Sequence, residues 1–72
     1  MIGKIKFYKQ DKRYGFIIDS VTFKEIFFHK IEVKGNYIPS MDDRVRYDIG
    51  EYKNTKVAKN IEKIQDDNNR RR

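Results

Sequence analysis

The chain has 72 residues, which is enough for one small domain and excludes a second. It contains no cysteine, so disulfide bonds, thiolate metal ligands and thiol catalysis are excluded together. Lysine and arginine number 17 against 11 acidic residues, and the resulting formal net charge of +6 favours a polyanionic partner, although a solvated basic surface would carry the same charge.

The first half of the chain contains three segments that are rich in aromatic and β-branched residues and are separated by polar turns. The predicted strands are 3–9, 14–19 and 25–30, with connections at 10–13 and 20–24. Strict alternation in the second strand places Tyr14 and Phe16 on one face and Ile17 on the other.

The second half is predicted to consist of a loop over 31–41, strands over 44–49 and 55–64, and a connection over 50–54. The loop contains glycine and proline, which interrupt strands, so we expect at most one short turn of helix there. The fourth strand alternates most clearly, and we expect Val45, Tyr47 and Ile49 to point inward. The last segment also fits a helical stripe, but its β-branched residues favour a strand.

Five short strands without a convincing helix indicate an all-β fold, a small antiparallel barrel whose closure removes exposed sheet edges. We assign residues 1–64 to this domain. Residues 65–72 are wholly polar and end in three arginines, so we expect a disordered basic tail. The first residues lack the apolar segment of a signal peptide, and no apolar run approaches the roughly 20 residues that span a bilayer. We therefore expect a soluble, cytoplasmic protein.

Aromatic side chains gather on one face of the second and third predicted strands. Alternation gives this face Tyr14 and Phe16 from one strand, and Phe27 and His29 from the other. If the two strands are neighbours, a cross-strand spacing of about 5 Å makes the side chains one continuous aromatic platform. The core residues predicted from the opposite faces are Ile17, Ile26 and Phe28.

Basic residues surround these rings along the sequence, namely Lys4, Lys6, Lys9, Lys12, Arg13 and Lys30. A ring gains roughly 1–3 kcal/mol from each base that stacks on it, while neighbouring cations contact phosphates. A duplex keeps its bases stacked on one another, so it offers the rings no partner. These residues therefore predict binding to single-stranded nucleic acid.

Five short motifs follow one another along the chain, namely GKIKFY at 3–8, KRYGFI at 12–17, IFFH at 26–29, VRYDI at 45–49 and AKNI at 58–61. In this order they resemble the cold-shock domain family, with the second and third matching its two ribonucleoprotein motifs and the last matching its closing Ala-x-Asn-Val. In the RNA-recognition-motif fold the two motifs come in the reverse order, which disfavours that fold. The resemblance implies a five-stranded OB-like barrel that binds single-stranded RNA or DNA with little sequence specificity and can act as an RNA chaperone.

The resemblance also implies which residues bind. The family's binding positions are occupied here by Lys6, Phe7, Tyr8, Lys12, Tyr14, Phe16, Phe27 and His29, to which we add Lys30 as a phosphate contact and Tyr37 as a further stacking ring. Strict alternation would place Ile5 and Phe7 on the same face. Because we expect Ile5 inside and Phe7 outside, we predict a bulge near Lys6.

Four positions depart from the family pattern, since Phe7 replaces its usual Trp, Lys9 its Asn, Arg13 a Gly and Lys30 an aromatic residue. These changes reduce the stacking area and add positive charge. We therefore expect weaker base discrimination and a steeper salt dependence than in typical members, because more of the binding free energy comes from counterion release. If the replaced Gly requires a positive φ, the turn at Arg13 must also change shape.

Catalytic and metal-binding functions find no support in the sequence. No Ser/His/Asp set, glycine-rich phosphate loop or zinc-ligand spacing is present, so we expect no enzyme activity, no metal and no cofactor. His29 has no cysteine or second histidine near it, and we expect it to stack on or hydrogen-bond to a base.

Two alternatives stay open. One is an SH3-like interaction barrel that binds a peptide on its aromatic face, and the other is an accessory domain detached from an enzyme. Our leading prediction is a monomer that binds single-stranded RNA or DNA, with no membrane partner and no small-molecule substrate.

Overall fold

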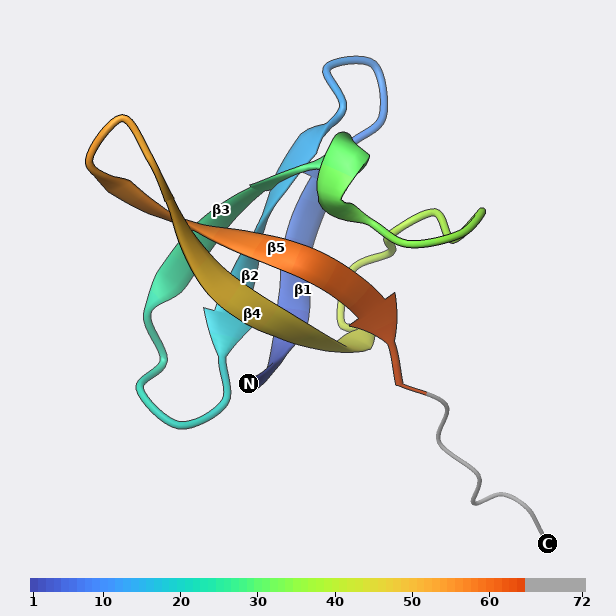
Figure 1. The fold of residues 1–72 in the computed structure, drawn as a ribbon. Helices are drawn as coiled ribbons and strands as arrows, with labels where there is room; N and C mark the ends of the chain where they lie inside the picture. Colours follow the sequence, from blue (N-terminus) through green and yellow to red (C-terminus); the bar gives the residue numbers. More distant parts are fainter. Residues whose placement is uncertain (65–72) are drawn as a thin grey trace, which may run out of the picture.

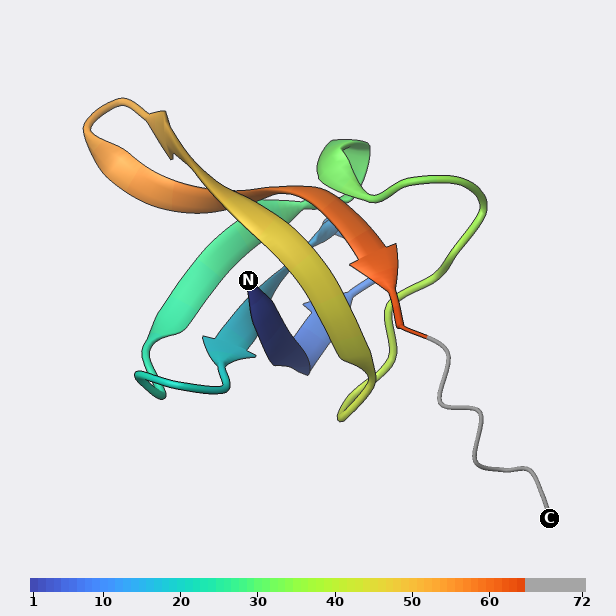
Figure 2. The same ribbon diagram turned by 60° about the horizontal axis from the view of Figure 1, so that its bottom comes forward.

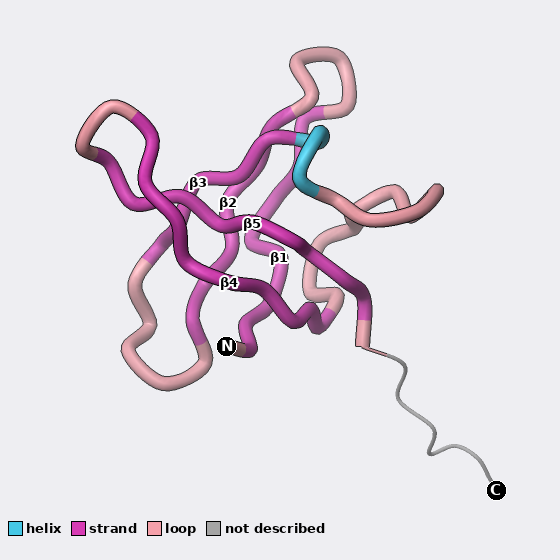
Figure 3. Tube along the Cα trace, in the orientation of Figure 1, coloured by secondary structure: helices cyan, strands magenta, loops and turns pink. Residues whose placement is uncertain are grey.

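The computed structural model describes residues 1–64, which form five β-strands and one short 3₁₀ helix (Figure 1). The strands are β1 (Ile2–Lys9), β2 (Tyr14–Asp19), β3 (Glu25–His29), β4 (Arg44–Tyr52) and β5 (Thr55–Lys63), and the helix is η1 (Lys30–Glu32). Figure 3 shows this helix as one short turn that follows β3 and leads into the long loop. The all-β prediction is confirmed. The predicted tail, residues 65–72, lies outside the described residues.

The strands close into a barrel in the order β1-β2-β3-β5-β4 (Figure 2). The pairs β1–β2, β2–β3, β4–β5 and β1–β4 are antiparallel, whereas β3 and β5 are parallel where Phe27 meets Val57. The predicted five-stranded barrel is thus confirmed, with the correction that it is not purely antiparallel. The reason is geometric, because strand directions cannot alternate all the way round a ring with an odd number of strands. One neighbouring pair has to be parallel.

β1 contains the predicted bulge. Its pairing with β2 shifts register between Ile5 and Phe7. Ile5 is fully buried, whereas Phe7 lies opposite Phe16 on the outward side of the sheet. Without the extra residue the two side chains would share a face, since side chains in a strand alternate with a period of two.

The core is one cluster inside the barrel, and every strand contributes to it. Its buried side chains are Ile5, Ile17, Phe28, Val33, Val45, Tyr47, Ala58 and Ile61, with Ile26 partly buried against them. Burying one such side chain contributes roughly 1.5–3 kcal/mol relative to leaving it exposed. Because the sequence has no cysteine for a disulfide, these few side chains carry the stability of the domain.

One inward assignment in β4 is wrong. Val45 and Tyr47 are buried as predicted, but Ile49 is 37% exposed. The register of β4 against β5 shifts between Arg46 and Asp48. This irregularity ends the simple alternation on which the prediction relied, so Ile49 no longer shares the inward face.

The hairpin between β4 and β5 is tighter than predicted. We expected a connection over 50–54, but β4 continues to Tyr52 and β5 begins at Thr55. The two turn residues, Lys53 and Asn54, have φ angles of 52° and 65°. Positive φ at both central residues is typical of two-residue hairpin turns, whose twist matches that of the flanking strands.

A buried hydrogen bond joins the end of β2 to β4. Asp19 is only 6% exposed, and its Oδ1 accepts a hydrogen bond of 2.5 Å from the Tyr47 hydroxyl. Its Oδ2 accepts the backbone N–H groups of Val21 and Thr22, each at 2.9 Å. The Tyr47 hydroxyl, followed by these backbone donors, lowers the pKa of Asp19 from 3.8 to about 2. Burial and the Asp19 carboxylate raise the pKa of Tyr47.

Tyr47→Phe is expected to destabilise the protein more at neutral pH than in acid. The pKa of Asp19 is lower in the folded protein than in the unfolded chain, so its carboxylate stabilises the fold above about pH 4. This stabilisation is lost as the pH falls towards 2. The variant lacks the Tyr47 hydroxyl, so Asp19 stabilises its fold less at neutral pH and its stability falls less in acid. Urea unfolding at pH 7, 4 and 2.5 measures the difference between variant and wild type, which should narrow as the pH falls. An equal difference at all three pH values would contradict this role of Asp19.

The turn between β1 and β2 holds Arg13 in a left-handed conformation. Its φ is 61°, and its N–H donates to the Lys9 carbonyl at 2.7 Å. Its own carbonyl accepts the Lys30 N–H at 2.8 Å, which ties the turn to the end of β3. The expected change in turn shape is therefore not found, because the arginine itself adopts the positive φ. This conformation is disfavoured for a side chain that carries a Cβ.

Arg13→Gly is expected to raise the free energy of unfolding by about 1 kcal/mol, because glycine adopts a positive φ without steric cost. A change of this size shifts Tm by roughly 4–8 °C in so small a domain. Thermal unfolding followed by circular dichroism measures it. Arg13→Ala is the matched control, since it removes the same charge and keeps the Cβ. Equal stability of the two variants would show that the left-handed conformation costs nothing here.

Candidate nucleic-acid interface

The register of β2 against β3 brings aromatic side chains together on the outward side of the barrel. Tyr14 lies opposite His29, and Phe16 lies opposite Phe27, so each pair shares a face. The ring centroids of Phe16 and Phe27 are 5.8 Å apart, and those of Tyr14 and Phe27 are 5.6 Å apart. The predicted juxtaposition of these side chains is confirmed.

β1 adds a further ring to this row. The bulge places Phe7 opposite Phe16, with their ring centroids 5.4 Å apart. We call Phe7, Tyr14, Phe16 and Phe27 the aromatic surface, and each of the four is only partly buried. The planes of contacting rings in this surface differ by 32° to 85°. The surface is therefore a row of separate ring faces and edges.

Gly15 permits the close approach of strands beneath the aromatic surface. A Cβ atom at this position would collide with the backbone carbonyl oxygen of Phe7 and would lie 2.9 Å from the ring of Phe28. Neither a backbone atom nor a core ring can move away cheaply. The glycine between Tyr14 and Phe16 is thus required by packing, independently of any ligand.

His29 is held in one orientation at the end of β3. Its Nδ1 accepts the backbone N–H of Ile31 at 3.1 Å, which caps the 3₁₀ helix η1. A ring nitrogen that accepts a hydrogen bond carries no proton, so the neutral imidazole has its N–H at Nε2. The exposed side chain can therefore donate one hydrogen bond from Nε2 to a ligand beside the aromatic surface.

Lys6 lies at the bulge, beside the aromatic surface. Its Nζ forms an ion pair of 2.6 Å with Oε2 of Glu25, and both side chains are roughly half exposed. An exposed pair of this kind contributes about 1 kcal/mol or less. A phosphate can therefore replace Glu25 as the partner of Lys6 at little cost.

Two other predicted cations belong to segments that meet at the opposite end of β3. Lys12 lies in the exposed turn after β1, and Lys30 opens η1. The hydrogen bond from the Lys30 N–H to the Arg13 carbonyl brings these segments side by side. Lysine side chains thus lie in the segments that border the aromatic surface on two sides, where a bound strand would place its phosphates.

Comparison with known families decides what kind of domain this is. The model of the 'Cold-shock' DNA-binding domain matches residues 1–64. The chain belongs to the cold-shock domain family. It is therefore a nucleic-acid-binding domain, in agreement with the motifs quoted above. No curated protein sequence matches the chain.

Solved structures support the fold of this cold-shock domain. Among 42 chains that match is the structure described as "drosophila Unr CSD456", with a TM-score of 0.76 and 20% sequence identity. The match covers 96% of the present chain and 28% of the other one. The chain thus spans little more than a quarter of that protein, and at this identity the likeness concerns the fold alone.

Tyr8 is not part of the aromatic surface in this cold-shock domain. It lies opposite Gly15 in the register of β1 and β2, on the side that faces the barrel interior. Its ring stacks on the buried ring of Phe28, with centroids 6.0 Å apart and planes 13° apart. The structure therefore gives this predicted binding residue a role in packing.

Tyr37 also lies apart from the aromatic surface. It belongs to the loop between η1 and β4, is partly buried against the core, and donates a hydrogen bond of 2.6 Å from its hydroxyl to Oδ2 of Asp43. Burial, followed by this carboxylate, raises the pKa of Tyr37. The Lys63 ammonium lies 5.7 Å from its ring centroid. The structure thus shows Tyr37 held within the domain by three contacts of its own.

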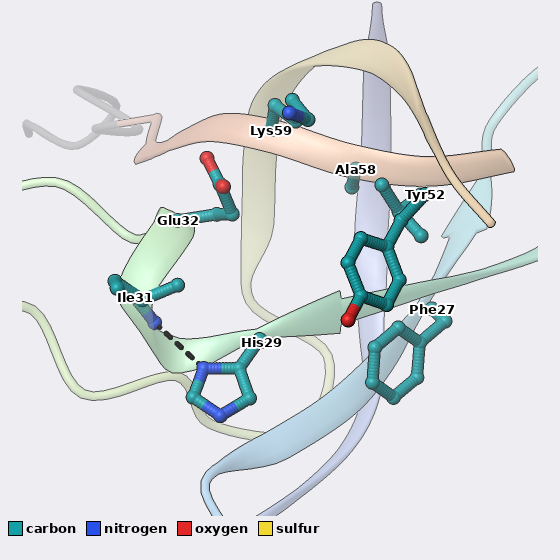
Figure 4. A pocket seen from close by; sticks show the side chains of 8 residues that line it. Phe27, His29, Ile31, Glu32, Tyr52, Ala58 and Lys59 are labelled. Atoms are coloured by element: carbon teal, nitrogen blue, oxygen red, sulfur yellow. Dashed lines mark hydrogen bonds between the residues drawn. The ribbon is translucent and has the colours of Figure 1, made fainter.

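A groove beside the aromatic surface contains a ring that sequence reasoning missed. It has a volume of about 400 Å³ and is lined by Phe27, His29, Ile31, Glu32, Tyr52, Val57, Ala58 and Lys59 (Figure 4). Tyr52 is 62% exposed and lies at the end of the extended β4. The available signal was Asn54, since asparagine tolerates the positive φ of a tight hairpin turn that would have lengthened β4.

Other kinds of site are not found in the described part of this cold-shock domain. Residues 1–64 contain no group of three or more His, Cys, Asp or Glu side chains placed to hold a metal ion. Within the same range, no helix has the length and apolar character needed to cross a membrane.

Tyr8→Ala is expected to destabilise the domain more than Phe7→Ala. Truncating Tyr8 opens space against Phe28 and the core, with a cost of about 2 kcal/mol, whereas the outward ring of Phe7 has less buried area to lose. Urea unfolding of both variants, followed by circular dichroism, compares the two costs. The opposite order would mean that Tyr8 does not pack as the structure shows.

Proposed function

We propose that this cold-shock domain binds single-stranded RNA or DNA by stacking bases on the aromatic surface and His29. Lys6, Lys12 and Lys30 would contact the phosphates. The observation that carries the proposal is the row of outward rings on three neighbouring strands, with adjacent centroids 5.4 to 5.8 Å apart. Each base stacked on such a ring contributes roughly 1–3 kcal/mol.

The preference for single strands follows from what the rings require. A stacked base must be unpaired and turned towards the protein, whereas the bases of a duplex already stack on one another. Both forms of nucleic acid attract a protein with a net charge of +6, so charge alone does not separate them. Stacking is therefore the basis of the proposed discrimination.

Low sequence specificity follows from the same chemistry. Every base has a π-face, so rings accept any of them, and phosphate contacts do not depend on sequence. A protein that binds only unpaired strands shifts RNA away from base-paired structures by mass action and needs no ATP. We propose that the domain acts in this way, as an RNA chaperone. One copy carries the complete aromatic surface, which supports action as a monomer, and we propose no small-molecule substrate.

A titration by fluorescence anisotropy tests the proposal. The labelled probes are an oligothymidine of about seven nucleotides, the matched oligouridine, and the same oligothymidine in duplex form. Seven nucleotides lie within the ~4–16 nucleotides that one such fold covers. Both single strands should bind clearly more tightly than the duplex. Their affinity should fall steeply between low and high salt, because bound phosphates release counterions.

The double variant Phe16→Ala/Phe27→Ala should weaken single-strand binding by about 100-fold or more, since two stacking contacts are lost. Phe23→Ala is the matched control, because Phe23 is 76% exposed but lies in the β2–β3 connection, outside the aromatic surface. Equal binding of single strand and duplex, unchanged by the double variant, would refute the proposal and favour a peptide ligand.

A further inference from the structure

The groove described above is continuous with the aromatic surface. Phe27 and His29 line the groove and also lie at or beside the aromatic surface. A nucleic-acid strand whose bases stack on the aromatic surface therefore passes the mouth of the groove. The groove lies beyond β3, where η1 and the β4–β5 hairpin supply the remaining walls. Its volume of about 400 Å³ falls within the ~300–1,000 Å³ typical of small-molecule sites.

Tyr52 forms the wall opposite η1. In Figure 4 its ring stands above Phe27, and its hydroxyl points towards the space between Phe27 and His29. No other ring within residues 1–64 contacts it, and the Lys53 ammonium lies 5.4 Å from its centroid. An aromatic ring that is 62% exposed beside an apolar groove leaves a face available for a planar ligand.

The charges in and around the groove indicate which part of a nucleotide enters it. Two charged side chains line the groove, Glu32 and Lys59, and their charges are opposite. The Glu32 carboxylate has no hydrogen-bond or ion-pair partner among the described residues, and its charge offsets that of Lys59, so the groove lining offers no net positive charge to hold a phosphate. The neutral base is therefore the part that fits inside, while the phosphate stays at the rim, near Lys53.

We propose that this groove is a further nucleobase-binding site, in which Tyr52 stacks on a base of the same strand that the aromatic surface holds. The inference rests on the proposed function and extends the binding site from the aromatic surface on β1, β2 and β3 to the β4–β5 hairpin. The Tyr52 hydroxyl and the Nε2–H of His29 are the groups that would meet the edge of the base. The Lys53 ammonium would contact the adjoining phosphate.

The test measures binding of an oligothymidine of about nine nucleotides to the full chain and to three variants. Tyr52→Ala should weaken binding by about 5- to 100-fold, which is the effect of losing one stacked base. Tyr52→Phe keeps the ring and should bind nearly as well as the wild type. Phe23→Ala removes a ring that is 76% exposed and lies in the β2–β3 connection, outside the groove lining, and should change nothing. Because Tyr52 is exposed, thermal unfolding should show that Tyr52→Ala stays folded.

A second readout locates the base directly. In a series of oligothymidines, each oligonucleotide carries a single 5-iodouracil, at a different position in each. Irradiation crosslinks this base covalently to an aromatic ring that it contacts. At one position the peptide that contains Tyr52 should be the crosslinked one. If the wild type binds and Phe16→Ala weakens binding, but Tyr52→Ala stays within about twofold and Tyr52 is never crosslinked, the groove proposal is overturned while the proposed function stands. If no single strand binds, the proposed function fails, and this inference fails with it.

Discussion

The close packing of β1 against β2 at Gly15 is the constraint on which the rest of the barrel depends. A side chain there would meet the backbone of Phe7 and the buried ring of Phe28, on which Tyr8 stacks. With the strands this close, the residue after Gly15, Phe16, stands beside Phe7 on the outside. The residue after Phe16, Ile17, points inward and is fully buried in the core. The same alternation therefore produces both the core and the surface that we propose for binding.

The aromatic surface of this cold-shock domain has less ring area, and more positive charge around it, than the family pattern implies. Phe7 stands at a position where the family has Trp, and Lys30 stands where it has an aromatic residue. Tyr52 offers a ring on the other side of Phe27, on the β4–β5 hairpin. If the groove binds a base, part of the stacking lost on one side of the interface is regained on the other.

Much of the candidate site followed from local pattern. Alternation placed Tyr14 and Phe16 on one face of β2, and Phe27 and His29 on one face of β3, and they come together because the two strands are antiparallel neighbours. Two predicted binding residues lie elsewhere. Tyr8 comes after the bulge and therefore turns inward, and Tyr37 lies in a loop whose course depends on the hydrogen bond to Asp43.

By itself, the sequence determined the all-β class and the bounds of β2, because the side-chain period of a strand is local and fixed. The bulge in β1 followed from the family resemblance, which required Phe7 to point outward although strict alternation would place it on the same face as the buried Ile5. The tertiary structure alone decided the parallel pairing of β3 with β5, the exposure of Ile49 and the position of Tyr52 beside Phe27. These features depend on how five strands close into one ring and on the register between segments far apart in the chain. No local periodicity encodes either of them.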